Sequence, residues 1–511
     1  MALARSFSVC LVGLAGHVVE VEADIAQGLP GLSITGLPDA ALNEARDRVR
    51  AAVVNSGHAW PQRRVTLGLS PAALPKRGSG FDVALAAALL AADGAVPTAA
   101  LHGVLLLGEL GLDGRVRPVA GVLPAVLAGA RAGFRRVVVP VENLAEARLL
   151  PDLECTGVTT LAMLVALLRG EPYLEPMLPE PAAAVEPAWR KDLLEVAGQP
   201  VGRLALEVAA AGGHNLLMTG PPGCGKSLLA ERMPGILPAL SLAEALEVTA
   251  IHSVAGQLPG SCPLVSRPPF QAPHHGATAA SVVGGGSGIA KPGAASLAHR
   301  GVLFLDEAPE FARGVLDALR QPMESGEIVI RRVGGTATYP ARFALLLAAN
   351  PCPCAKPARS CSCRPEQRRG YLARLSGPLL DRLDLHVPLP AITRAEVMAE
   401  RGLGEDSAQI ATRVAAARER TLLRLVGTPW RTNADVPPTV QLARWPVRRS
   451  LLAGPGRALD KGLLTARGFG RVQRLAWTLA DLHDHGQPTL EDVELALSLR
   501  IGDERTREVA A

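Results

Sequence analysis

The sequence predicts an α/β protein of about three domains, and three observations support this prediction. The chain has 511 residues, a length that usually corresponds to about three domains. Several short apolar runs end at glycine, acidic or amide residues, which is typical of buried parallel strands whose loops form a site. From about residue 393 onward the pattern is helical, with mixed Arg and Glu and few β-branched runs.

Residues 1–170 are expected to form the first α/β unit. Apolar and acidic residues alternate over Val18–Ala23, so the apolar start of the sequence is interpreted as strand rather than as a signal peptide. An Ala- and Leu-rich run over Phe81–Ala92 predicts a helix. Residues 171–187 are rich in proline and glutamate, which predicts an extended linker.

The most informative motif lies at residues 220–227, which match the phosphate-binding pattern G-x-x-x-x-G-K-[ST]. A strand-like run precedes the motif and a helix-forming run, residues 228–232, follows it, as a phosphate loop requires. Lys226 would reach the β- and γ-phosphates of ATP, and the Ser227 hydroxyl would hold Mg²⁺. A Gly/Pro surface turn is the alternative, which the scarcity of lysine disfavours, since the chain has six lysines and 47 arginines. The predicted ATP-binding residues are Gly220, Pro221, Pro222, Gly223, Cys224, Gly225, Lys226 and Ser227.

A second strand, over residues 301–305, ends in two carboxylates. Because ligands bind at the carboxyl ends of strands in open α/β sheets, we expect Asp306 to bind Mg²⁺ and Glu307 to act as general base on the attacking water. A core strand with acidic ends is the alternative, which the neighbouring phosphate motif disfavours. A third apolar run, residues 342–349, ends at Asn350.

The order of these three strands resembles the AAA+ ATPases. That resemblance implies that Asn350 is the sensor-1 residue that positions the lytic water. Residues 376–384 resemble the segment that carries an arginine finger in the helicase and chelatase branches, so Arg382 is expected to reach the ATP of a neighbouring subunit, with Arg374 in reserve. Arg467 resembles sensor 2 of a helical lid. Ordinary surface charges are the alternative for Arg382 and Arg467.

Further segments are similar to the YifB/ComM family of magnesium-chelatase-like AAA+ ATPases, over nearly the whole chain. The resemblance implies a nucleotide-binding core over residues 188–392 with a helix-2 insert, and a helical lid over residues 393–511. It also implies a homohexameric, ATP-driven DNA motor that promotes branch migration of recombination intermediates and is linked to natural competence. The similar segments include residues 36–39, 76–82, 270–278, 284–288, 292–300, 319–324, 350–354, 464–467 and 475–482.

In that family, an insert around residues 277–289 and a hairpin starting at residues 328–332 would contact DNA. Lys291, Arg331 and Arg332 are therefore predicted to contact backbone phosphates, whereas solvated surface charges are the alternative for each. His274 and His275 are interpreted as structural or as positioning the insert, rather than as metal ligands.

Half of the eight cysteines fall within twelve residues, as Cys352, Cys354, Cys361 and Cys363. Four thiolates bind Zn²⁺ tetrahedrally, so the spacing C-x-C-x6-C-x-C predicts a zinc site. The spacing is shorter than the common C-x2-C form, and reduced loop cysteines are the alternative. The loop over residues 350–375 is basic and would suit DNA binding.

Residues 100–143 resemble the Lon protease domain, which has an S5-like α/β fold. Lon uses a Ser–Lys dyad, and Ser79 lies in a segment similar to the one that carries its serine. However, no lysine occurs between Lys76 and Lys191, so the segment that should carry the base, residues 122–127, lacks it. The unit is therefore expected to be a non-proteolytic scaffold.

Composition narrows the remaining functions. A net charge of +5 and a pI near 8.9 permit a nucleic-acid partner, and an aromatic content of 3% excludes base stacking as the main binding mode. The sequence contains no typical membrane span, and the protein is expected to be cytoplasmic. Two alternatives stay open: a chelatase-type motor that remodels a protein or metal-insertion partner, and an ATP-dependent Lon-like protease, which the missing lysine disfavours.

Overall fold

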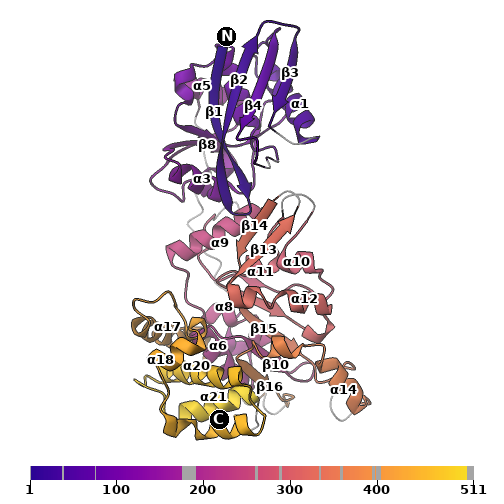
Figure 1. Cartoon of the computed structure of the whole chain (residues 1–511), viewed down its shortest axis with the longest axis vertical. Coiled ribbons are helices and arrows are strands. Elements are labelled where there is room, and N and C mark those ends of the chain that lie inside the picture. The colour runs from indigo at the N-terminus through magenta and orange to yellow at the C-terminus, as the bar shows by residue number, and fades with distance from the viewer. Residues whose placement is uncertain are drawn as a thin grey trace.

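The computed structural model describes residues 2–36, 40–74, 76, 78–174, 191–258, 263–286, 290–332, 335–356, 361–393, 398 and 404–502. The molecule is elongated, with the N-terminal sheet at one end, the phosphate-loop sheet in the middle and the C-terminal helices at the other end (Figure 1). The part of the predicted linker beyond residue 174 and residues 287–289 of the predicted insert lie outside the described residues.

Seven strands form the N-terminal sheet, in the order β3-β4-β2-β1-β5-β8-β9. Strands β1 and β2 pair antiparallel along their whole length, so Val18–Ala23 lies in a strand, as predicted. Helix α2 is buried along its entire length because ten of its eleven residues are Ala, Leu or Val, whose apolar side chains pack against neighbours on every side. The elements of this unit are β1 (Ala2–Val12), β2 (Ala15–Ala26), β3 (Gly31–Thr35), α1 (Ala40–Asn55), β4 (Arg64–Ser70), α2 (Asp82–Ala92), β5 (Val104–Leu106), α3 (Val122–Arg131), β8 (Arg136–Pro140), α4 (Leu144–Ala147), β9 (Glu154–Val158) and α5 (Leu161–Arg169).

Five parallel strands form the second sheet, in the order β11-β12-β15-β10-β16. Strands β10, β12 and β15 are the three predicted from sequence, and their carboxyl ends meet at one edge. The helix after the phosphate loop, α7, ends earlier than predicted, because Pro234 has no N–H to donate to the carbonyl of Ala230. The elements are α6 (Pro200–Gly212), β10 (Leu216–Thr219), α7 (Lys226–Ala230), β11 (Phe270–Gln271), β12 (Val302–Leu305), β15 (Ala344–Ala349) and β16 (Leu385–Pro388).

The predicted hairpin consists of β13 and β14, which pair antiparallel and pack against the insert. Tyr339 on β14 donates its hydroxyl to the carbonyl of Ala290 at 2.6 Å. Ile330 on β13 packs so closely against Gly284 that a Cβ atom there would lie 2.8 Å from its Cδ1 atom. The elements are α9 (Leu242–Ala255), α10 (Ala279–Val283), α11 (Ala294–Leu297), α12 (Arg313–Ala318), β13 (Glu327–Arg332) and β14 (Gly335–Pro340).

Among the described residues, the C-terminal helices share their core with the second sheet, although chain length suggests a third domain. Helices α17 and α20 pack against α6, and their apolar residues join one continuous core with the second sheet. Burial disfavours the charged form of Asp384. Arg471 pairs with this carboxylate and Arg474 lies 3.7 Å from it, and both help to hold the pKa of Asp384 well below its usual range. Within the described residues, every helix is too short or too polar to cross a lipid bilayer. The helices are α17 (Ser407–Arg424), α18 (Pro438–Arg444), α19 (Ala453–Asp460), α20 (Ala466–Leu482) and α21 (Leu490–Ile501).

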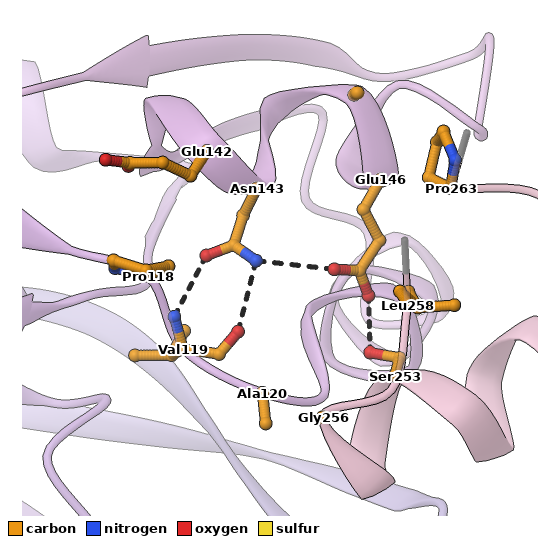
Figure 2. A pocket seen from close by; sticks show the side chains of 11 residues that line it. Pro118, Val119, Ala120, Glu142, Asn143, Glu146, Ser253, Gly256, Leu258 and Pro263 are labelled. Atoms are coloured by element: carbon orange, nitrogen blue, oxygen red, sulfur yellow. Dashed lines mark hydrogen bonds between the residues drawn. The ribbon is translucent and has the colours of Figure 1, made fainter. Parts of the chain in front are cut away.

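The N-terminal unit contacts the second unit where α3 meets α9. Ser253 on α9 accepts the backbone N–H of Gly121 at 3.1 Å and donates its hydroxyl to the buried carboxylate of Glu146 (Figure 2). The backbone N–H of Leu123 also donates to Glu146, at 2.7 Å. Burial raises the pKa of Glu146, which borders a cavity of about 330 Å³ between the two units.

Candidate active site and metal centre

The phosphate loop connects the carboxyl end of β10 to the first turn of α7. Gly223 and Gly225 have φ angles of 78° and 92°, in the left-handed region that other residues rarely adopt. At Gly220, a Cβ atom would lie 2.5 Å from the carbonyl oxygen of Leu389. These glycines allow the tight loop in which backbone N–H groups can surround phosphate oxygens.

The side chain of Lys226 is buried and contacts the loop itself. Its Nζ atom donates to the carbonyl of Gly220 at 2.8 Å, to that of Pro221 at 2.9 Å and to Oδ1 of Asn350 at 3.1 Å. The structure thus brings together two predicted site residues that follow different strands. Because charged phosphate oxygens are stronger acceptors than these neutral ones, a bound nucleotide would attract the ammonium group.

Ser227 and Asp306 lie side by side at the same sheet edge. The hydroxyl of Ser227 donates to Oδ2 of Asp306 at 2.7 Å, and the backbone N–H of Glu307 donates to Oδ1 of Asp306 at 2.9 Å. Mg²⁺ in nucleotide sites is bound by one or two such protein oxygens together with phosphate oxygens and water. This donor set fits the predicted magnesium site, whose occupancy stays a prediction.

Glu307 follows β12 in a left-handed conformation, with φ of 51° and ψ of 43°. Its carboxylate is about half exposed and lies 3.4 Å from Nδ1 of His275. The sequence predicts a structural or insert-positioning role for His275 and no contact with the base. No spacing rule could have revealed the contact, because it joins two separate loops.

Arg382, the predicted arginine finger, is paired within its own chain. Its guanidinium contacts the carboxylate of Glu324 and donates to the carbonyl of Pro378 at 2.7 Å. Its side chain is only 12% exposed. To reach a neighbouring subunit, Arg382 would have to leave Glu324, and its role as finger stays a prediction.

The two other candidate arginines are more exposed. Arg374 donates to the carboxylate of Glu310 at 3.0 Å, and its side chain is 54% exposed. Arg467, the predicted sensor 2, lies 3.6 Å from Asp381 near the start of α20 and is 68% exposed. Both side chains are paired within their own chain, and their roles at the nucleotide stay predictions.

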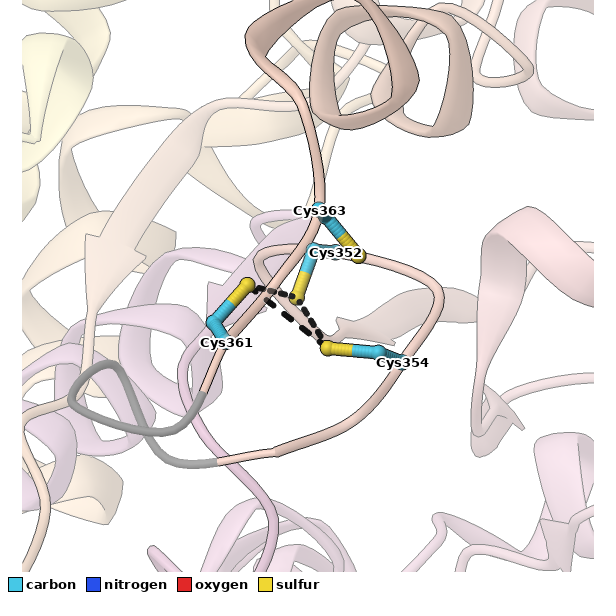
Figure 3. Close-up of side chains that lie close together, drawn as sticks. All are labelled: Cys352, Cys354, Cys361 and Cys363. Carbon is cyan, nitrogen blue, oxygen red and sulfur yellow. Dashed lines mark hydrogen bonds between the residues drawn. The ribbon is translucent and has the colours of Figure 1, made fainter.

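The four predicted zinc ligands converge in the structure (Figure 3). The sulfur of Cys352 lies 3.3 Å from that of Cys354 and 3.4 Å from that of Cys361, and all four sulfurs lie within 4.8 Å of one another. A tetrahedral zinc site places its sulfurs about 3.8 Å apart, so this donor set fits Zn²⁺. Burial raises the pKa of Cys352 to about 12, whereas the backbone N–H of Cys363 lowers that of Cys361 to about 6.

The cysteine cluster lies between the ATP site and a basic helix. Cys352 follows Asn350 by two residues, and α14 (Pro365–Leu372) begins just after Cys363. Helix α14 projects from the side of the molecule (Figure 1). Arg364, Arg368 and Arg369 are exposed there, so a metal at the cluster would fix a basic surface.

The three candidate DNA-contacting residues gather on the insert and the hairpin. Arg331 and Arg332 are exposed at the end of β13. Exposed Lys291 forms a backbone bridge with Gly285, and a Cβ atom on Gly285 would lie 3.4 Å from Nη2 of Arg332. The structure thus places Arg332 close to the backbone bridge of Lys291, and contact of the three residues with DNA stays a prediction.

Ser79 in the N-terminal unit has a carboxylate as its partner. Its hydroxyl donates to Glu109, whereas the buried ammonium of Lys76 donates to the carbonyl of Pro71. Helix α3, which occupies the segment where Lon carries its lysine, has none. That the unit is a non-proteolytic scaffold stays a prediction.

Three protein-family models match successive parts of the chain. The family described as magnesium chelatase, subunit ChlI, matches residues 192–397. The family of subunit ChlI of Mg-chelatase matches residues 21–143, and that of its C-terminal part matches residues 404–500. A Lon protease of Roseiflexus castenholzii is 35% identical over 145 residues, which cover 27% of this chain and 18% of that protein.

Three relatives match over almost their whole length. An uncharacterized protein of Mycobacterium tuberculosis strain H37Rv is 53% identical over 98% of this chain and 99% of its own. The uncharacterized protein YifB of Escherichia coli K12 is 40% identical over 98% of both chains. The competence protein ComM of Haemophilus influenzae is 38% identical over 95% of both. The chain therefore belongs to the YifB/ComM family of magnesium-chelatase-like proteins.

Proposed function

We propose that this protein is an ATP-hydrolysing DNA motor that assembles as a homohexamer in the cytoplasm. It promotes branch migration during recombination or natural transformation, in keeping with the printed description of its relative ComM as a competence protein. The observation that carries the proposal is the meeting of Lys226, Ser227, Asp306, Glu307 and Asn350 around the carboxyl ends of three adjacent strands.

Each of these residues has a distinct task in ATP hydrolysis. Lys226 binds the β- and γ-phosphates, while Ser227 and Asp306 hold Mg²⁺, which supplies charge neutralisation on the phosphates. Glu307 takes the proton of the attacking water as general base, and Asn350 orients that water. Arg382 of a neighbouring subunit stabilises negative charge on the γ-phosphate in the transition state, which makes the site depend on ring assembly.

The surface of Lys291, Arg331 and Arg332 binds DNA in this proposal. Charged side chains on phosphates give an affinity that falls steeply with salt and does not depend strongly on sequence. Such contacts suit a motor that moves along branched or single-stranded DNA. The Cys352–Cys363 cluster holds Zn²⁺ and orders the basic surface of α14, which adds a second region of phosphate contact.

ATP hydrolysis measured with and without four-way junction DNA tests the proposal. Stimulation by the junction, lost when Arg331 and Arg332 are both changed to Ala, supports a DNA motor. A chelatase-type motor that remodels a protein or metal-insertion partner is the second candidate, because three matched families carry the chelatase subunit description. DNA would leave the hydrolysis rate of such a motor unchanged.

A further inference from the structure

Two histidines and an aspartate converge where α20 meets α21, among the C-terminal helices (Figure 1). Nδ1 of His483 lies 2.8 Å from Oδ1 of Asp492, and Nδ1 of His485 lies 2.9 Å from Oδ2 of the same carboxylate. Within the described part of the chain, only this group and the cysteine cluster bring three or more His, Cys, Asp or Glu ligand atoms within 4.8 Å of one another. This helix corner is therefore a second place where several side chains of metal-binding type meet.

The end of α20 fixes both histidines. His483 is the C-cap residue, and its backbone N–H donates to the carbonyl of Leu479 at 2.9 Å. Asp484 follows in the left-handed conformation, with φ of 61°, and the N–H of His485 then donates to the carbonyl of Ala480 at 2.8 Å. The two imidazoles thus belong to a hydrogen-bonded helix end rather than to a free loop.

The start of α21 fixes the carboxylate. Asp492 forms a capping box with Thr489, whose N–H and hydroxyl donate to Oδ2 at 2.8 and 2.9 Å. The side chain of Asp492 is fully buried, whereas those of His483 and His485 are 45% and 36% exposed. The site therefore has a rigid carboxylate at its base and two imidazoles at its rim, where an ion can bind from solvent without any unfolding.

This donor set suits a divalent transition metal. Imidazole and carboxylate groups together bind Zn²⁺ and its neighbours in the first transition row. In a tetrahedral zinc site, nitrogen and oxygen ligands lie about 3.3 Å apart, so the pairs at 2.8 and 2.9 Å need to separate by only about 0.5 Å. Each Nδ1 atom would bind the metal in place of its proton, with the remaining ring proton on Nε2. Three protein ligands leave the fourth position to water.

The backbone also favours a cation beside the two histidines. Helix α20 has 17 residues, and its C-terminal end carries the negative end of the helix dipole. The start of α21 carries the opposite partial charge, but the carboxylate of Asp492 lies there and compensates for it. A positive ion at the corner is thus next to one helix end that attracts it and one buried carboxylate.

We infer that His483, His485 and Asp492 form an exchangeable site for a divalent transition metal ion, with Zn²⁺ as the best fit. Three ligands at a partly exposed corner bind more weakly than four thiolates, so the site fills when metal is supplied and empties on dialysis against a chelator. This inference goes beyond the proposed function and does not depend on it.

A metal at this corner would act as a structural link between two helices of the lid. It would join the end of α20 to the start of α21 independently of the sequence between them. At the other end of α21, Arg500 donates to the carbonyl of Leu383, the residue after Arg382. The linked helix therefore reaches the segment that carries the predicted arginine finger.

Zinc binding by full-length protein with Cys354→Ser and Cys361→Ser, which removes the competing cluster, tests the inference. After dialysis against EDTA, titration against a chromophoric zinc chelator should show one saturable Zn²⁺ per chain, and X-ray absorption should show only nitrogen and oxygen ligands. Adding His485→Asn should lower the affinity at least about 10²-fold, because losing a ligand costs more than losing a partner outside the coordination shell. Its amide can still donate to Asp492, so the turn is kept.

The control is His17→Ala in the same background, which removes an exposed histidine from β2 and should leave zinc binding unchanged. If the two serine substitutions prevent folding, the wild-type protein supplied with zinc should bind two ions per chain, and His485→Asn should remove one of them. A folded serine-substituted protein without saturable zinc binding would overturn the inference. Zinc affinity that is unchanged by His485→Asn would overturn it as well.

Discussion

Two serines of this chain, Ser227 and Ser79, occupy comparable local settings. Each belongs to an α/β unit, and each donates its hydroxyl to a carboxylate, Asp306 in one case and Glu109 in the other. Their surroundings differ. Only the first pair lies where three parallel strands end, beside a lysine and an amide that can bind phosphate and water.

The lysine near each serine explains why the two surroundings differ in function. Lys226 lies within hydrogen-bond reach of loop carbonyls and Asn350, in a loop that a phosphate can enter. Lys76 is fully buried and occupied by the carbonyl of Pro71, and burial lowers its pKa. The function of a serine beside a carboxylate therefore depends on the other groups around the pair. Two similar serine–carboxylate pairs can for this reason differ completely in function.

The largest expected effects come from the ATP site. Lys226→Ala should abolish nucleotide binding, because no other side chain of the loop carries a positive charge. Glu307→Gln should keep ATP bound and lower hydrolysis by about 10²–10⁴-fold, the usual contribution of a general base. Equilibrium binding of a fluorescent nucleotide and phosphate release measure the two effects separately. Hydrolysis at the wild-type rate by the Glu307→Gln protein would show that the base is another residue.

The next largest effect on ATP hydrolysis is expected at Arg382, which would complete the ATP site of a second subunit. Arg382→Ala should be nearly inactive alone, because the guanidinium would act on a neighbour's γ-phosphate. Mixing it with Glu307→Gln subunits should partly restore ATP hydrolysis, since some interfaces then contain both groups. Arg374→Ala, treated in the same way, is the matched comparison. Stable mixed rings with no recovered activity would argue against Arg382 as a finger.

A smaller effect on ATP binding is expected from changes in the cysteine cluster. Purified protein should contain about one Zn²⁺ per chain, as for other four-thiolate sites. Replacing Cys354 and Cys361 with Ser should remove the metal and weaken DNA binding more than ATP binding, because the cluster contains no phosphate-contacting motif. Cys155→Ser, outside the cluster, should keep the zinc. Elemental analysis that finds no zinc in protein prepared without chelator would refute the site.

The smallest effect on ATP hydrolysis is expected at Ser79. Ser79→Ala should leave ATP hydrolysis unchanged and cost about 1 kcal/mol of stability through one lost hydrogen bond, seen as a small shift in the denaturant midpoint. Wild-type protein should not degrade casein with ATP present. Casein degradation that disappears in Ser79→Ala would show that the N-terminal unit is a protease after all.

Much of the ATP site could be predicted because its information is local. The phosphate loop, the strand before Asp306 and the paired cysteines are short patterns whose spacing is set by backbone geometry. The contact of His275 with Glu307 and that of Glu146 with Ser253 escaped prediction, because each depends on how separate segments pack in three dimensions. The shared core of the C-terminal helices escaped for the same reason, since apolar helix faces do not specify their partners.

Branch migration of a synthetic four-way junction, followed by gel electrophoresis at constant salt, tests the account most directly. The wild-type protein with ATP and Mg²⁺ should convert the junction into its duplex products. Glu307→Gln protein should bind the junction without converting it, and Ser79→Ala protein should match wild type. Junction conversion that proceeds equally well without ATP, or no conversion by a wild-type protein that hydrolyses ATP, would contradict the assignment of this chain as a DNA motor.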